Sequence, residues 1–275
     1  MKKLDRLDWA EGFSWSAFGV RAGIRVNVAG VSPRILPLLP SGWRKSRRVT
    51  VPRLYSLVLG EDDEHAGMKR LSLLYADSIR LARDVASNQV LEAFESDLHL
   101  YTATESSDMT FLHAGVVGWQ GRAVLVPGRS FSGKTTLVRE MMRLGATYYS
   151  DEFAVVDNNG LVHPFARPLG IREELSYAHT KYTAHSLGAT TGVVPLPVGV
   201  TVISKYKAGA RWQPTPMSRG QGALELLANS VAVRSRPHQT LLRIHKLASQ
   251  AVFISGTRGE AREAAASILG AMERV

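Results

Sequence analysis

The stretch VPGRSFSGKTTLVRE, residues 126–140, decides the fold of this chain. It gathers glycines, serines and threonines around one lysine, Lys134, between an apolar run and a helical pattern. It fits the pattern G-x-x-x-x-G-K-[ST] through Gly128, Gly133, Lys134 and Thr135. The pattern predicts a loop that binds the phosphates of a nucleotide, here called the phosphate loop.

Each residue type in the phosphate loop has a physical role. Small residues leave backbone N–H groups free to converge on a polyphosphate, and the positive end of the following helix adds to the attraction. Lys134 is predicted to reach the β- and γ-phosphates, and the Thr135 hydroxyl to ligate Mg²⁺. A Gly/Ser-rich turn between strand and helix is the alternative. The predicted nucleotide-binding residues are Gly128, Ser130, Ser132, Gly133, Lys134, Thr135 and Thr136.

Two carboxylates, Asp151 and Glu152, follow the predicted strand ATYYS, residues 146–150. Ligands of open α/β sheets collect at the carboxyl ends of strands, so these groups are predicted to face Mg²⁺ or the γ-phosphate. In a kinase, Asp151 accepts the proton of a substrate hydroxyl and Glu152 assists with the metal. In an ATPase, Asp151 holds the metal through water and Glu152 orients the attacking water. The third interpretation is a surface turn in which the two acidic side chains are merely solvated.

Two further residues are candidates for the same site. His113 lies on the predicted strand that pairs with the strand entering the phosphate loop, so the hairpin brings it toward Asp151; a purely structural histidine is the alternative. Arg167, between an apolar pair and Pro168, is predicted either to neutralise the transferred phosphoryl group or to close a surface ion pair.

The segment HAGVVGWQGRAVLVPGRSFSGKTTLVREMMRLGATYYSDE, residues 113–152, resembles the catalytic domain of HPr kinase/phosphorylase. That family has a His-Gly pair, a short hairpin, a P-loop, a helix and a strand that closes in Asp-Asp. The spacings from His113 to Lys134 and from Lys134 to Asp151 agree with it. Entry into the loop through a hairpin is shared with nucleotide-dependent phosphoenolpyruvate carboxykinases. The resemblance is thinner toward residue 172 and is closest to divergent HPr kinase-like proteins of bacteria.

The resemblance implies an ATP- and Mg²⁺-dependent kinase that phosphorylates a serine hydroxyl. It assigns the base role to Asp151, with His113 and Lys134 beside it, and Mg²⁺ to Thr135, Asp151 and Glu152, where Glu152 replaces the second aspartate. The acceptor is a serine of a peptide or protein, or a small hydroxylated metabolite. Because relatives in the family assemble into oligomers, a homo-oligomer is also implied.

The chain departs from the family at several places. Ala114 stands where the family has the glycine of its His-Gly pair. The family's later signature holds a metal-binding glutamate close to an arginine, but HPFARPLGIREE, residues 163–174, has no carboxylate before Arg167. Residues 1–106 show no match to the family's usual N-terminal domain, so the resemblance does not name HPr as the acceptor.

Composition excludes several classes of function. The 275 residues include no cysteine, which excludes a disulfide framework, a thiolate metal site and a cysteine nucleophile. The N-terminal MKKLDRLDWAEG mixes both charge signs without an apolar core, so no signal peptide is expected. The chain lacks an apolar run of about 18 residues, so neither a transmembrane helix nor a membrane partner is expected. These features predict a cytoplasmic location.

The chain carries a formal net charge of +10. Its densest basic run comprises Arg44, Lys45, Arg47, Arg48 and Arg53. This run has no interleaved aromatic residues and belongs to no nucleic-acid-binding module, so a nucleic-acid partner is not expected. A solvated loop is the first interpretation of the run, and a site for an anionic substrate or partner is the second.

The predicted architecture is an α/β fold with two domains. Residues 1–106 form a smaller α+β domain that recognises the acceptor, and residues 107–275 form the catalytic domain, a P-loop kinase core of the HPr kinase and phosphoenolpyruvate carboxykinase type. Periodicity predicts helices over residues 88–104, 134–145, 220–233, 238–249 and 258–272. It predicts one or two strands over 13–30, a hairpin of two strands around Trp119-Gln120-Gly121 over 111–128, and strands over 53–60, 69–77, 78–84, 146–150, 153–157, 197–206 and 251–255.

Three functions are compatible with these residues. The first is a kinase that uses Asp151 as general base. The second is a P-loop ATPase or nucleotide-dependent switch protein that hydrolyses ATP with Asp151 and Glu152. The third is a nucleotide-binding regulatory module without turnover, against which the intact Lys134, Thr135 and Asp151 argue.

Overall fold

A computed structural model describes residues 4–48, 50–60, 71–128, 132–172 and 179–272. Ser130, one of the predicted nucleotide-binding residues, lies outside the described residues. The chain divides into two compact units, Met1–Ser107 and Asp108–Val275. Both units combine strands and helices, which confirms the predicted mixed α/β class. In the described part of the chain, no helix is both long and apolar enough to cross a membrane.

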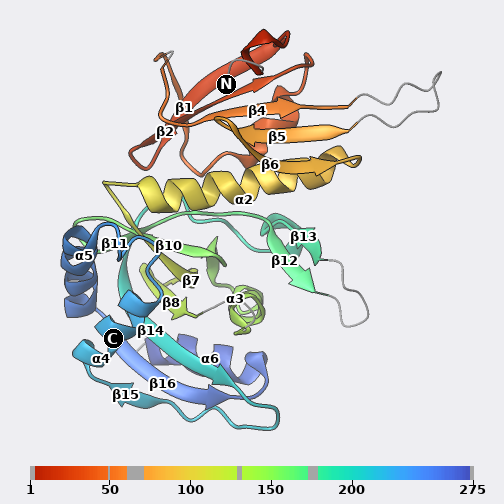
Figure 1. Ribbon diagram of the computed structural model, residues 1–275. Coiled ribbons are helices and arrows are strands. Elements are labelled where there is room, and N and C mark those ends of the chain that lie inside the picture. The colour runs from red at the N-terminus through yellow and green to blue at the C-terminus, as the bar shows by residue number, and fades with distance from the viewer. Residues whose placement is uncertain (1–3, 49, 61–70, 129–131, 173–178, 273–275) are drawn as a thin grey trace. The chain divides into compact units, whose positions relative to one another are not determined.

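The first unit is built on a six-stranded sheet (Figure 1). The strand order is β3-β1-β2-β4-β5-β6, in which only β2 and β4 are parallel neighbours. Its strands are β1 (Glu11–Ala17), β2 (Val20–Val26), β3 (Arg44–Ser46), β4 (Leu54–Val58), β5 (Ser72–Ala76) and β6 (Ile79–Asp84). A short 3₁₀ helix, η1 (Leu4–Arg6), precedes them.

Helix α2 (Ser87–Glu105) closes the core of this unit against the sheet. Phe94 is fully buried and meets the rings of Trp15 and Tyr55 edge-on, with centroids 6.4 and 5.0 Å away. Such T-shaped pairs favour one packing arrangement over others. The proline-broken segment before β3 forms only the one-turn helix α1 (Ser32–Ile35) and the 3₁₀ turn η2 (Leu36–Leu38).

The second unit is built on an eight-stranded sheet, with the order β11-β10-β7-β8-β14-β16-β15 and β9 added beside β7. The hairpin of β7 and β8 was predicted, as was its turn at Gln120-Gly121. The strands are β7 (Thr110–Trp119), β8 (Arg122–Pro127), β9 (Thr147–Ser150), β10 (Phe153–Val156), β11 (Leu161–His163), β14 (Leu196–Tyr206), β15 (Thr215–Met217) and β16 (Val252–Arg258). Outside this sheet lie the hairpin of β12 (Leu169–Arg172) and β13 (His179–Tyr182), and the turn η3 (His185–Leu187).

Helices cover both faces of the second sheet. Helices α3 (Lys134–Arg143) and α6 (Ala261–Met272) share one apolar cluster with strand residues such as Val124 and Val200. Helices α4 (Arg219–Ala228) and α5 (Pro237–Gln250) share a second cluster with Leu125 and Phe253. The result is a three-layer α/β arrangement in which α3 leaves the sheet directly after the phosphate loop.

Several predicted boundaries were wrong, among them the start of the last helix, which begins at Ala261 and not at Arg258. The helix predicted over residues 220–233 ends at Ala228, because the chain that follows pairs with β7 instead: His113 N donates to Asn229 O at 2.7 Å and Val231 N to Phe111 O at 3.0 Å. The strand predicted over 251–255 continues to Arg258, because β16 pairs with β14 along its whole length. The longer β16 brings Arg258 to the candidate site.

Candidate functional site

The candidate site lies where several strands of the second sheet end together. Strands β8, β14 and β16 are parallel, and β9 runs in the direction of β8 because both are antiparallel to β7. Their carboxyl ends therefore share one edge of the sheet, which is where ligands of α/β proteins bind. The phosphate loop follows β8 at this edge, Asp151 follows β9, and Arg258 ends β16.

The described part of the phosphate loop is held by close backbone contacts. Gly128 N donates to His113 O at 3.1 Å, and Lys134 Nζ donates to Gly128 O at 2.6 Å. A Cβ on Gly128 would lie only 2.8 Å from Ser132 Oγ, so a larger residue there would require the Ser132 side chain to move. Gly133 caps α3 in the left-handed region, with φ of 81°. The first turn of α3 is thereby turned toward the site, with Thr135 half-buried and Thr136 exposed.

The hydroxyl of Thr135 joins the phosphate loop to the predicted acidic residue. Thr135 Oγ1 donates to Asp151 Oδ2 at 3.3 Å. Lys134 lies within electrostatic range of the same carboxylates: burial lowers its pKa, while Asp151 and Glu152 raise it. The structure therefore brings Lys134, Thr135 and Asp151 together, as their spacing in the sequence predicted.

Asp151 and Glu152 interrupt what is otherwise one long strand. Strand β9 pairs with β7 up to Val116, β10 resumes the pairing at His113, and the acidic pair lies between them. Ala114 N still donates to Glu152 O, at 3.2 Å. Breaking the ladder at this point directs Asp151 toward the phosphate loop instead of along the sheet.

The environment of Asp151 raises its pKa. Burial is the main cause, and the charge of Glu152 adds to it, whereas hydrogen bonds from Tyr148 and Thr135 and the charge of Arg167 act in the opposite direction. A carboxylate with a raised pKa has a greater affinity for a proton, which suits a general base.

Tyr148 positions Asp151 and was not predicted from the sequence. Its phenol lies 3.0 Å from Asp151 Oδ1 and 2.9 Å from the carbonyl oxygen of Arg167. Burial, together with Asp151, raises the pKa of Tyr148 far above its ordinary value, so the phenol keeps its proton. Tyr148 therefore fixes the orientation of the carboxyl group and ties it to the segment that carries Arg167.

Arg167 and Glu152 form an ion pair beside Asp151. The Arg167 side chain is 17% exposed and the Glu152 side chain 41% exposed, so the pair lies at the mouth of the site. Of the two roles predicted for Arg167, the structure contains the ion pair, and it places that pair next to the candidate base.

His113 occupies the start of β7, opposite Phe153, and its ring packs on the Phe153 ring with centroids 5.0 Å apart. Its side chain remains open to solvent on one side. Burial of the inner face lowers the pKa of His113, Lys134 lowers it further, and Glu152 raises it. His113 is therefore a neighbour of Lys134 and Glu152, and the lowered pKa favours its neutral form.

Arg258 is the main residue that sequence reasoning missed. It is 3% exposed, and it forms no ion pair with any carboxylate in the described part of the chain. Its guanidinium donates to the carbonyls of Gly133, Ser132 and Gly259, at 2.9, 3.5 and 3.2 Å, and lies over the Tyr206 ring. Arg258 Nε and Ser132 Oγ are both buried without a hydrogen-bond partner. Arg258 therefore places a buried positive charge, held mainly by backbone carbonyls, beside the start of α3.

The oxygen atoms of Thr135 and Asp151 suit Mg²⁺, which prefers hard oxygen ligands and takes its others from water and phosphates. Glu152, the third predicted metal ligand, is engaged by Arg167. Within the described residues there is no group of three or more His, Cys, Asp or Glu side chains that could hold a metal ion. Thr135 and Asp151 therefore remain as the candidate protein ligands for Mg²⁺ in this part of the site.

No protein-family model matches the chain, and a search of curated proteins found no significant match. The interpretation of the site therefore rests on its own residues.

Proposed function

We propose that the chain is an ATP- and Mg²⁺-dependent kinase of the HPr kinase-like type, which transfers the γ-phosphoryl group of ATP to a hydroxyl. The observation that carries the proposal is the hydrogen bond of Thr135 to Asp151, beside Lys134. It links the loop that would hold the polyphosphate to the carboxylate that would receive a proton.

The phosphate loop would hold the polyphosphate through the backbone N–H groups at the start of α3, with Gly133 in the conformation that exposes them. Lys134 would exchange its contact with the Gly128 carbonyl for the β- and γ-phosphates. Thr135 and Asp151 would hold Mg²⁺, which when bound neutralises charge on the phosphates. Arg258 adds a buried positive charge to the same end of the helix.

Transfer requires one proton to leave the acceptor. The acceptor oxygen attacks the γ-phosphorus, the bond from that phosphorus to the bridging β-oxygen breaks, and the hydroxyl proton passes to the Asp151 carboxylate. Tyr148 keeps that carboxylate oriented. Arg167, held beside Asp151 by Glu152, would stabilise negative charge on the transferred group. The acceptor is a peptide, a protein or a small metabolite that carries a hydroxyl.

The test is to incubate the full chain with γ-labelled ATP and Mg²⁺, with and without fractions of cell extract. Label on a peptide, protein or metabolite, lost in Lys134→Ala, supports the kinase. Label released only as inorganic phosphate in every fraction contradicts it and supports the ATPase. Absence of both products and of nucleotide binding contradicts any nucleotide-dependent function.

A further inference from the structure

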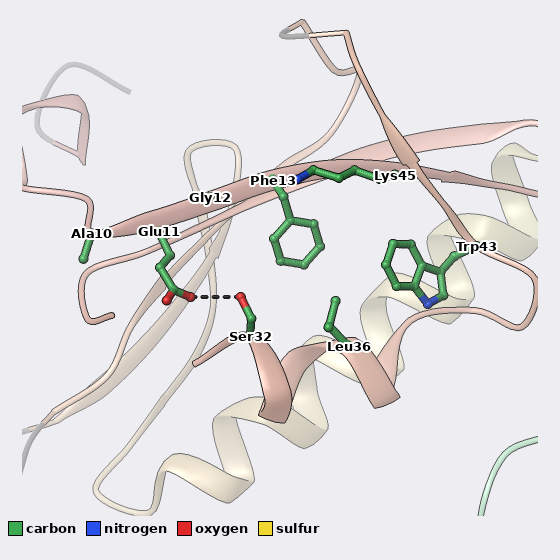
Figure 2. A pocket seen from close by; sticks show the side chains of 8 residues that line it. All are labelled: Ala10, Glu11, Gly12, Phe13, Ser32, Leu36, Trp43 and Lys45. Carbon is green, nitrogen blue, oxygen red and sulfur yellow. Dashed lines mark hydrogen bonds between the residues drawn. The ribbon is translucent and has the colours of Figure 1, made fainter. Parts of the chain in front are cut away.

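The first unit contains a pocket of about 460 Å³ between the start of β1 and the turns α1 and η2 (Figure 2). Three apolar side chains form its walls: Phe13 and Trp43 are half-buried, and Leu36 is 37% exposed. In Figure 2 the Phe13 ring and Leu36 lie between Trp43 on one side and Glu11 with Ser32 on the other. A pocket of this size and lining accepts one large apolar group.

Four cations follow Trp43 closely in the sequence, on and just after β3. Arg44, Lys45, Arg47 and Arg48 are all exposed, and none of them pairs with a carboxylate in the described part of the chain. Lys45 also lines the pocket itself. By contrast Arg53, from the same basic run of the sequence, is engaged by Asp77, Asp97 and the Tyr101 ring. The four other cations have no such internal role.

The backbone that carries these cations is held in place and lies at the edge of the sheet. Strand β3 pairs only with β1 in the strand order. The Ser14 hydroxyl contacts the carbonyls of Ser46 and Arg48, at 3.2 and 2.9 Å, so the backbone of Arg44–Arg48 is held against β1. An edge strand offers backbone groups to an added strand, and successive side chains of that strand point to opposite faces.

We propose that this docking surface, the pocket of Phe13, Leu36 and Trp43 with the basic edge Arg44–Arg48, binds an extended acidic segment of a partner protein. The segment lies along β3, inserts one aromatic or aliphatic side chain into the pocket, and sets its carboxylates against the four cations.

The charges on the surface favour a peptide over a nucleic acid. Glu11 lines the pocket and accepts hydrogen bonds from Gly30 N and from Ser32 Oγ. These bonds, that of Gly30 first, lower the pKa of Glu11, so it is ionised at neutral pH. A nucleic acid carries a negative charge at every nucleotide and would bring phosphates close to this carboxylate. A peptide can present a neutral side chain to the pocket and its acids only to the basic edge.

The inference does not depend on the proposed kinase function. Every residue of the docking surface belongs to the first unit, whereas the nucleotide-binding candidates belong to the second. Peptide binding and nucleotide binding can therefore fail separately.

The test measures fluorescence polarisation of the labelled peptide Glu-Asp-Glu-Phe-Glu-Asp-Glu with the full chain at physiological salt. Two companion peptides replace Phe with Ser, or every acid with Lys. We expect the first peptide to bind, the Ser peptide to bind at least about tenfold more weakly, and the Lys peptide not to bind. Trp43→Ser and the double variant Lys45→Glu/Arg47→Glu should each weaken binding at least about tenfold.

The matched control is Arg80→Glu/Arg83→Glu, which makes the same charge change on β6 at the opposite edge of the sheet. It should bind like the parent, as should Lys134→Ala, and thermal melting checks that every variant folds. Equal binding of the Phe and Ser peptides, or equal loss in the β6 control, overturns the proposal. Binding of oligothymidylate or anionic vesicles without the acidic peptide overturns it in favour of those partners.

Discussion

The guanidinium of Arg258 donates to the carbonyl oxygen of Gly133 at 2.9 Å, at the point where α3 begins. The two residues fit against each other so closely that a Cβ on Gly133 would overlap Arg258 Nη2. Burial lowers the pKa of Arg258, which means that keeping this side chain charged in the folded protein costs free energy. The positive end of α3 adds to that cost, and a bound polyphosphate would relieve both.

Arg258→Met should therefore weaken nucleotide binding more than it weakens folding. Removing one buried positive charge near the polyphosphate should raise the Kd for ATP by about 10- to 100-fold, and Arg258→Lys should recover part of this loss. Titration with a fluorescent ATP analogue measures the effect, and thermal melting is the control. A lower melting temperature with an unchanged Kd would show that Arg258 only supports the fold.

Gly133→Ala tests the backbone of the phosphate loop. Alanine at φ of 81° is strained and would displace Arg258, so we expect a loss of stability of at least about 1 kcal/mol together with a loss of ATP binding. The matched control is Gly220→Ala in α4, where φ is not positive and the added Cβ would meet nothing within 4 Å. That control should be neutral or stabilising by up to about 1 kcal/mol. Urea unfolding compares the two, and equal effects would contradict the argument.

The centre of the site could be predicted because its parts are close in the sequence. The hairpin of β7 and β8, the loop and α3 follow one another, so periodicity and the glycine positions predict the order of strand, loop and helix. The Gln120-Gly121 turn, with both φ values positive, sets the hairpin register that brings His113 to the loop. Asp151 follows as the end of the next strand.

Arg258 and Tyr148 could not be found in this way. Arg258 reaches the loop because β16 pairs with β14 in the folded sheet. The sequence pattern had instead predicted that Arg258 begins the last helix. In the sequence, Tyr148 looks like one more residue of a buried strand. The neighbouring residues do not indicate that its hydroxyl contacts Asp151. Strand β3 was likewise missed, because three residues rich in cations lack an apolar alternation and are held by Ser14 from another strand.

Asp151→Asn should lower the rate of phosphoryl transfer much more than it lowers the affinity for ATP. The amide keeps the shape of the side chain and can still accept from Thr135, but it cannot take up the acceptor proton, so kcat should fall by about 10²- to 10⁴-fold. The Kd for ATP measured without Mg²⁺, which does not depend on metal ligands, should change less than about tenfold. Glu152→Gln, which loosens Arg167 and leaves the base, is the comparison and should have the smaller effect on kcat. Full activity of Asp151→Asn would exclude Asp151 as the base.

The turn between β10 and β11 predicts a pH-dependent contribution to stability. Burial alone raises the pKa of Asp157, but hydrogen bonds from His163 and from the amides of Leu161 and Asn159 bring it below its ordinary value. A carboxyl group whose pKa is lower in the folded state stabilises the fold above its unfolded pKa, and this contribution disappears as the pH falls through the folded value. Asp157→Asn should therefore lower the free energy of unfolding by about 1–2 kcal/mol at pH 7, and the difference from the parent should shrink as the pH falls below the ordinary carboxyl pKa. Urea unfolding across this range measures it, with Asp8→Asn, at an exposed position, as the control. A difference that stayed constant while the pH was lowered until Asp157 is protonated in the folded state would mean that its charge contributes nothing.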